Sequence, residues 1–96
     1  STTQARLTFT PECHGSEILI ASIDGKPVGH ARPHPSGDSI PCYAVYLHPD
    51  ILPGTRLSAL IAKGCFYELR ALRRSNIKYL RRRKEKDIRL RIYFSL

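Results

Sequence analysis

Positive charge is concentrated in one stretch of the chain, residues 70–91 (RALRRSNIKYLRRRKEKDIRLR). This stretch holds eleven Lys and Arg residues and only two acidic residues, a net charge of +9. The other residues hold five basic and six acidic side chains, so the whole chain carries a net charge of +8. Polyanions bind where many Arg and Lys side chains within a short span replace their counterions. The stretch therefore predicts a surface that meets a nucleic acid or an acidic protein partner.

Two tyrosines, Tyr79 and Tyr93, add aromatic rings to the basic residues. Single-stranded nucleic acids are commonly held by bases stacked on aromatic rings and by Arg and Lys contacts to phosphates. A solvated basic face without a partner is the alternative interpretation. The predicted binding residues are Arg70, Arg73, Arg74, Lys78, Tyr79, Arg81, Arg82, Arg83, Lys84, Arg89, Arg91 and Tyr93.

Histidines and cysteines form a second set of residues with possible chemistry. His30 and His34 have the spacing of the second half of a zinc finger, but the close Cys pair of the first half is absent. A sheet could still bring these histidines and two cysteines, Cys13 and Cys42, to one end. We expect histidines with ordinary roles in loops, and neither a metal nor a cofactor. The cysteines, which with Cys65 number three, are expected to be free buried thiols in a reducing compartment.

No catalytic motif stands out. One of the four histidines beside a cation could cleave RNA, and small basic ribonuclease toxins of this size exist. No spacing selects one histidine among His14, His30, His34 and His48. The sequence also lacks a carboxylate pair, a nucleophile motif and a glycine-rich phosphate loop. We therefore expect a protein that is not an enzyme.

The length of 96 residues predicts one domain over 1–96. A hydrophobic content of 42% and a charged content of 25% are typical of a folded protein. No segment approaches the roughly 18 apolar residues of a membrane span, and the first twelve residues lack the apolar core of a signal peptide. We expect no membrane association and a cytoplasmic location.

Apolar alternation and turn residues predict four strands in the first half of the chain. These strands span residues 5–10, 17–23, 28–32 and 41–47. Asp24-Gly25 between the second and third strands is a strong hairpin signal. Pro27 predicts that the third strand lies at the sheet edge or is limited to the few residues around 28–32, because proline cannot donate a hydrogen bond to a neighbouring strand. Such an edge could pair two copies of the chain as a homodimer.

The residues after Thr55 have a helical period, because apolar side chains recur every three or four residues from Leu57 to Leu72. Thr55 is the expected N-cap. Gly64 costs a helix about 1 kcal/mol relative to Ala, so a hairpin turning at Lys63-Gly64 is the competing interpretation. A basic helical segment is predicted over 70–87, either as part of one bent helix or as a second helix from Ile77.

The last nine residues alternate strictly, which predicts a strand with one face in the core. Its predicted core residues are Ile88, Leu90, Ile92, Phe94 and Leu96. The elements together predict an α+β fold: a mostly antiparallel sheet of about five strands, one or two helices packed on one face, and a C-terminal core strand.

Residues 18–37 and 43–61 (ILIASIDGKPVGHARPHPSG and YAVYLHPDILPGTRLSALI) resemble the middle of a GNAT acetyltransferase. That family has a strand, a DGKxVG hairpin, another strand and a loop that opens a helix. The resemblance implies acetyl-CoA bound on a loop with several glycines. Only Gly54 stands in the corresponding loop here, which departs from the pattern.

A second resemblance begins at PGTRL (residues 53–57) and continues through Gly64-Cys65 to Leu69. These residues, about a fifth of the chain, resemble the closing hairpin of AbrB-like domains, including SymE-type toxins. This resemblance implies strands rather than a helix over residues 56–72.

The leading hypothesis is a small non-enzymatic nucleic-acid-binding accessory protein that uses its Arg- and Lys-rich helix and its last strand. The alternative is a compact interaction or inhibitor protein of viral or plasmid type, whose basic face docks on an acidic surface of a partner. A third hypothesis is a small ribonuclease toxin. The sequence does not distinguish DNA from RNA.

Overall fold

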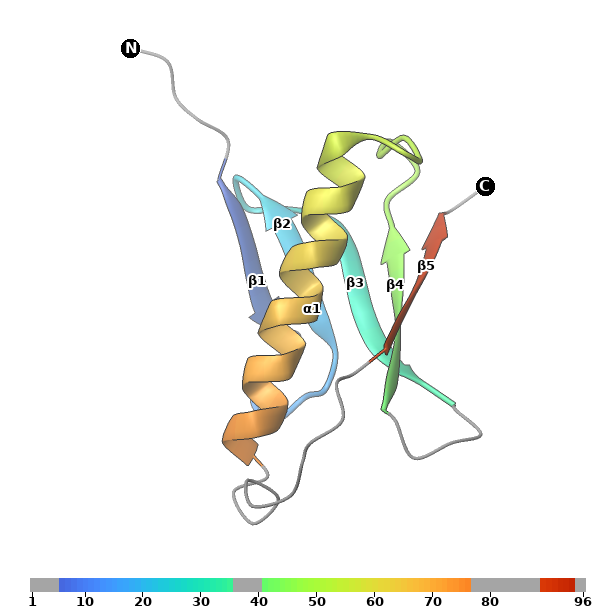
Figure 1. Ribbon diagram of the computed structural model, residues 1–96. Helices are drawn as coiled ribbons and strands as arrows, with labels where there is room; N and C mark the ends of the chain where they lie inside the picture. Colours follow the sequence, from blue (N-terminus) through green and yellow to red (C-terminus); the bar gives the residue numbers. More distant parts are fainter. Residues whose placement is uncertain (1–5, 36–40, 77–88, 95–96) are drawn as a thin grey trace.

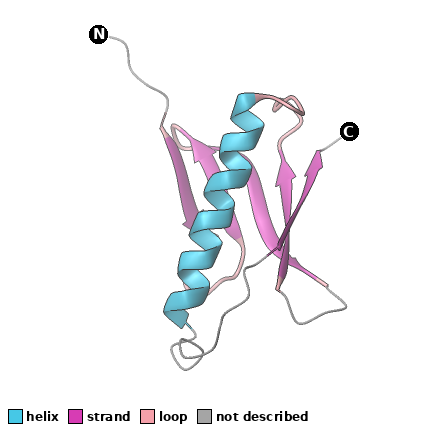
Figure 2. Ribbon diagram, in the orientation of Figure 1, coloured by secondary structure: helices cyan, strands magenta, loops and turns pink. Residues whose placement is uncertain are grey.

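The computed structural model describes residues 6–35, 41–76 and 89–94, and it shows one helix packed on one face of a sheet (Figures 1 and 2). The chain order is β1 (Leu7–Pro11), β2 (Leu19–Ile23), β3 (Lys26–His34), β4 (Cys42–Leu47), α1 (Arg56–Asn76) and β5 (Arg89–Phe94). Strands β1 to β4 pair with their neighbours in antiparallel order. The predicted α+β fold, with a mostly antiparallel sheet and a helix on one face, is confirmed.

The β2–β3 hairpin turns at Asp24-Gly25, as predicted. Both residues have positive φ angles, 50° and 83°, which a type I′ turn requires. Asp24 also ties this turn to the start of β1: the Arg6 N–H donates to Asp24 Oδ1 at 2.9 Å, and the Asp24 N–H donates to the Arg6 carbonyl at 2.9 Å. The turn therefore fixes the register of three strands.

The prediction of an edge position for the third strand is wrong, because β3 lies between β2 and β4. Pro27 pairs with Ser22 and Gly29 pairs with Ala21, so Val28 is an extra residue at an irregularity of the register. A bulge tolerates proline, since the ladder is interrupted there. The Val28 carbonyl still accepts a hydrogen bond from the His48 N–H at 2.8 Å. A free edge near Pro27, on which the expected homodimer depended, is therefore absent.

Helix α1 confirms the helical interpretation of residues 56–72 and contradicts the hairpin. Thr55 is the N-cap: the Ser58 N–H donates to Thr55 Oγ1 at 3.2 Å, and Thr55 Oγ1 donates to the Leu52 carbonyl at 2.8 Å. The Ser58 hydroxyl donates to the Thr55 carbonyl at 2.7 Å, which adds to the first turn. The bond from the Ser58 N–H satisfies one of the backbone donors that a helix N-terminus leaves without partners.

Gly64 stands where α1 passes over β1. A Cβ placed on Gly64 would lie 2.1 to 3.0 Å from three ring atoms of Phe9, too close for any side chain without movement of the ring. The helix therefore contains a glycine because the ring of Phe9 occupies the space that a side chain would need.

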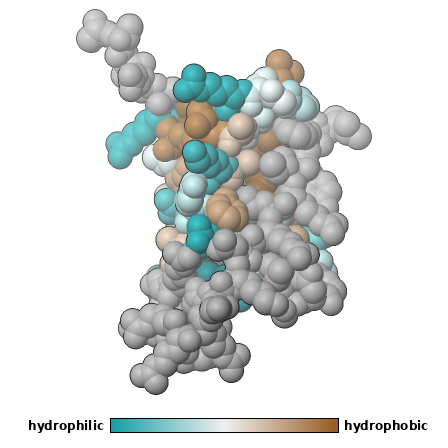
Figure 3. Space-filling model, in the orientation of Figure 1, coloured by the Kyte–Doolittle hydropathy of each residue, from teal (hydrophilic) through white to brown (hydrophobic). Residues whose placement is uncertain are grey.

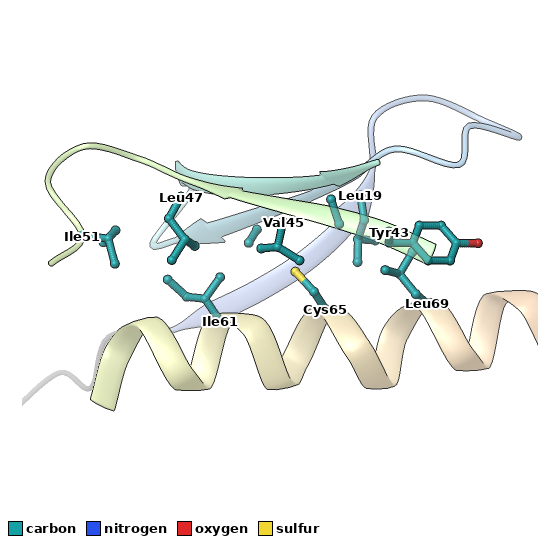
Figure 4. Close-up of a cluster of buried hydrophobic side chains, with 10 residues drawn as sticks. Leu19, Tyr43, Val45, Leu47, Ile51, Ile61, Cys65 and Leu69 are labelled. Carbon is teal, nitrogen blue, oxygen red and sulfur yellow. The ribbon is translucent and has the colours of Figure 1, made fainter. Parts of the chain in front are cut away.

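The core lies between α1 and the sheet (Figure 4). Ile61, Cys65 and Leu69 point from the helix toward side chains of β2 and β4. The sheet contributes Leu19, Tyr43, Val45 and Leu47 to this contact, and Ile51 closes its end. Full burial of each Leu, Ile or Val contributes about 1.5–3 kcal/mol, so this face supplies most of the stability.

Strand β5 pairs in parallel with β4. The chain crosses from β4 to β5 by way of α1, since parallel neighbours need a long connection. The register of β5 places the Cα atoms of Leu90, Ile92 and Phe94 opposite the core residues of β4. The side chains of β5 lie outside the described residues, as does the segment 77–88, so the C-terminal core strand, the second helix and the single domain over 1–96 stay predictions.

Candidate nucleic-acid interface

The residues predicted to bind divide into three groups in the structure. Arg70, Arg73 and Arg74 lie in the last turns of α1. Arg89, Arg91 and Tyr93 lie in β5, where the backbone alone is described. The remaining six lie outside the described residues: Lys78, Tyr79, Arg81, Arg82, Arg83 and Lys84.

Arg70 lies beside an aromatic ring on α1. Its guanidinium carbon is 5.4 Å from the centroid of the Phe66 ring, within the range of a cation–π contact. Phe66 in turn meets Tyr67 edge to face, with ring centroids 5.7 Å apart. The contact with the Phe66 ring therefore holds the Arg70 side chain against the surface of the helix.

The face of the sheet opposite α1 carries a second group of candidate residues. Alternation along the strands places Leu19, Ala31 and Val45 in the core, so their neighbours in sequence lie on the opposite side. We call this surface the far face, defined by Thr8, Thr10, Ile20, His30, Arg32 and Tyr46.

His30 of β3 and Tyr46 of β4 stack on each other at the centre of the far face. They are Cα partners across the two strands, and their ring centroids lie 5.1 Å apart with planes inclined by 23°. Both side chains are half-buried, and Arg32 beside them is exposed. The pair offers flat aromatic surface next to a cation.

The register of β5 brings two predicted binding residues to the same part of the sheet. Tyr93 is the Cα partner of Tyr46, and Arg91 is the partner of Ala44. Ala44 pairs on its other side with Arg32, so Arg32 and Arg91 flank one position of β4. Residues directly opposite one another share a face of a sheet. The far face thus continues from His30 toward β5 at the level of the backbone.

The charged residues within the described strands are all basic, and the carboxylate that acts on His30, Glu12, directly follows β1. None of the residues in the described strands is Asp or Glu. Partial burial lowers the pKa of His30 below its ordinary 6.5, and the nearby charge of Arg32 lowers it further, against a smaller opposite effect of Glu12. At neutral pH the His30 ring is therefore uncharged and suited to stacking, whereas Arg32 supplies the positive charge.

Sequence reasoning missed His30, Arg32 and Tyr46 as candidate binding residues. The predicted third strand contains His30 and Arg32, but the histidines were expected to have ordinary roles, and the sequence does not show that Tyr46 shares their face of the sheet. A usable signal was available: Arg and His occupy alternate positions of β3 on the side away from Ala31.

His48, by contrast, has a local role in the turn after β4. Its Nδ1 accepts a hydrogen bond from the Asp50 N–H at 3.2 Å. A nitrogen that accepts this bond carries no proton, so the 3.6 Å approach of the Asp50 carboxylate to the same atom is not an ion pair in this tautomer. His48 therefore behaves as expected of a loop histidine.

Two of the three thiols that were predicted to be buried are buried in the structure. Cys42 and Cys65 are buried as expected, whereas Cys13 is exposed, because it lies in the loop between β1 and β2. Burial, and secondarily the charge of Glu68, raise the pKa of Cys65 to about 12. Within residues 6–35, 41–76 and 89–94, no three His, Cys, Asp or Glu side chains are grouped to hold a metal ion.

Comparison with known protein families, with curated proteins and with solved structures gave no match. The resemblance to the AbrB-like hairpin loses its basis, because its residues form α1. None of these comparisons supports the resemblance to acetyltransferases, and the loop before α1 holds Gly54 alone. In the described part of the chain, no helix has the length and apolar character to cross a membrane.

Proposed function

We propose that this protein is a small non-enzymatic accessory protein that binds nucleic acid on the far face of its sheet and with the basic stretch of residues 70–91. The observation that carries the proposal is the His30–Tyr46 stack beside Arg32, on a sheet whose described strands hold no carboxylate. Aromatic rings on a sheet receive bases, and adjacent cations contact phosphates.

The basic stretch supplies the larger electrostatic contribution. Its eleven Lys and Arg residues far exceed the basic residues on β1 to β4. Each phosphate contact releases a counterion and makes the affinity more dependent on salt. In this proposal the stretch attracts and holds the backbone, and the far face contacts the bases.

The proposal includes β5 as a core strand of a five-stranded sheet in a single domain, with Leu90, Ile92 and Phe94 facing α1. Support comes from its register, which sets these residues opposite Tyr43, Val45 and Leu47. The three free thiols support a reducing, cytoplasmic compartment.

The test is fluorescence anisotropy with labelled single- and double-stranded DNA and RNA at about 50 and 200 mM salt, a range in which phosphate contacts change affinity strongly. Replacing Arg81, Arg82 and Arg83 together by Ala should lower the slope of log affinity against log salt by roughly 3. An unchanged slope would remove the basic stretch from the proposal.

Two matched pairs of variants test the far face itself. Tyr46→Leu should weaken binding by about 1–3 kcal/mol if a base stacks there, whereas Tyr67→Leu on α1 should not. Arg32→Ala should lower the salt slope by about 1, and Arg56→Ala on α1 is its control. Failure of all four nucleic acids to bind at low salt would refute nucleic-acid binding and favour the alternative, an acidic protein surface.

A further inference from the structure

Helix α1 carries exposed apolar side chains that the core does not use. Leu57, Leu60 and Tyr67 expose 37%, 45% and 53% of their surface, and Leu52 before the helix exposes 67%. These four are the exposed large hydrophobic residues of the described chain. We call Leu57, Leu60 and Tyr67 the apolar stripe.

The apolar stripe lies along one flank of α1. Successive residues of an α-helix are about 100° apart, so positions 57, 60, 64 and 67 follow one side. Gly64 in this row faces the Phe9 ring, which places the flank beside β1, an outer strand of the sheet. On this side of the molecule, apolar atoms gather over the upper part of α1 and beside β1, with hydrophilic side chains among them (Figure 3).

The stripe is separate from the contact that holds the helix to the sheet. Ile61, Cys65 and Leu69 make that contact and are fully or almost fully buried. The stripe residues therefore remain on the surface of a helix that is already docked. A contiguous apolar patch with a polar rim is typical of a protein interaction site.

Charge on the rim selects the kind of partner. Arg56 and Lys63 are exposed along the outer side of the stripe, and Glu68, the single acidic residue of α1, is exposed on the opposite side of the stripe, four residues after Gly64. A second copy packed stripe to stripe would bring these basic rims against each other, and like charges across an interface are unfavourable. A partner with acidic residues beside its apolar face would meet opposite charges instead.

We propose that the apolar stripe of α1, with its basic rim of Arg56 and Lys63, docks an acidic amphipathic helix of a protein partner. Apolar anchors three or four residues apart are the pattern by which helices recognise one another. This surface lies on the helix side of the sheet and the far face on the other, so the protein would connect a protein partner to the polyanion bound elsewhere. Docking of this partner helix does not depend on nucleic-acid binding.

The test is a selection from displayed helical peptides with a fixed Leu face and flanks randomised among Asp, Glu, Lys, Arg and Ser, using the full chain as the target. The expected result is enrichment of Asp and Glu in the flanks. Enriched flanks that are neutral or basic, or no enrichment, would overturn the proposal.

The selected peptide is then measured by anisotropy against three variants. Leu60→Ser with Tyr67→Ser should weaken its binding at least tenfold. Lys63→Glu should weaken the acidic peptide and favour its Lys-substituted version. Thr10→Ser, which is exposed on the far face of the sheet, is the control and should change nothing. Equal binding by all variants, or sedimentation showing a dimer that the double variant abolishes, would contradict the assignment.

Discussion

The two faces of the sheet differ in what determines their residues. On the side of α1, small and branched apolar side chains such as Ala31, Val45 and Leu47 fill the space beneath the helix. On the far face, the next residues along the same strands are His30, Arg32 and Tyr46. Packing accounts for the first set and gives no reason for the second. Among the described elements, the helix covers only one face of these strands, and this is why we propose the other face as the binding surface.

The largest expected difference between the faces is in stability. Leu47→Ala should lower the free energy of unfolding by about 2–5 kcal/mol, because Leu47 is almost completely buried and its removal leaves a cavity. Arg32→Ala on the far face should change it by less than about 0.5 kcal/mol. Urea denaturation of both variants measures this. Similar losses would mean that the far face is part of the core.

Gly64→Ala tests how closely the helix packs against Phe9 of β1. Alanine favours the helix by about 1 kcal/mol, but its methyl group would meet the Phe9 ring, and such overpacking costs about 1–3 kcal/mol. We expect a net loss of stability by urea denaturation, with partial recovery when Phe9→Leu is added. A more stable Gly64→Ala protein would show that the ring moves aside freely.

His30 gives the far face a pH dependence. Its pKa lies below 6.5 in the folded state because of partial burial and Arg32. The unfolded chain, with the ordinary pKa, therefore binds more protons as the pH falls below 6.5, so the His30 contribution to stability is present above 6.5 and is lost as the pH falls through the folded pKa. NMR titration of the ring should show the lowered pKa. His30→Gln should reduce the acid loss of stability, and an equal loss in both proteins would contradict it.

The smallest predicted effect concerns two thiols, one in the loop between β1 and β2 and one beneath the helix. Cys13 is exposed, whereas Cys65 is buried with a pKa of about 12 and holds almost no thiolate at neutral pH. A thiol reagent should modify Cys13 rapidly in the folded protein and Cys65 after denaturation. Rapid modification of Cys65, located by mass spectrometry, would mean that the helix opens readily.

Local features of the fold were predictable from the sequence. Asp24-Gly25 defines its turn because the required φ angles belong to the two residues themselves, and the period of Leu57, Ile61 and Cys65 favoured the helix. The position of β3 was not predictable from Pro27, because a bulge opposite β2 accommodates the proline. The reason for Gly64 likewise lies in another element, in Phe9 of β1.

The candidate site was predictable only in part. The basic stretch is visible as composition. His30 and Tyr46 are far apart in the sequence, and only the register of β3 with β4 makes them neighbours. The exposed flank of α1 was also missed. The periodicity of apolar residues predicts a helix, but it does not show which of these residues the sheet covers.

The most direct test of the central claim is an NMR titration of the protein with a short single-stranded oligonucleotide at about 50 mM salt. We predict that the amide signals of His30, Arg32 and Tyr46 and the ring signals of His30 and Tyr46 shift most within β1 to β4. The amide signals of Leu57, Leu60 and Tyr67 on α1 should stay in place. Shifts confined to α1, or no shifts in β3 and β4, would contradict the assignment of the far face as the nucleic-acid interface.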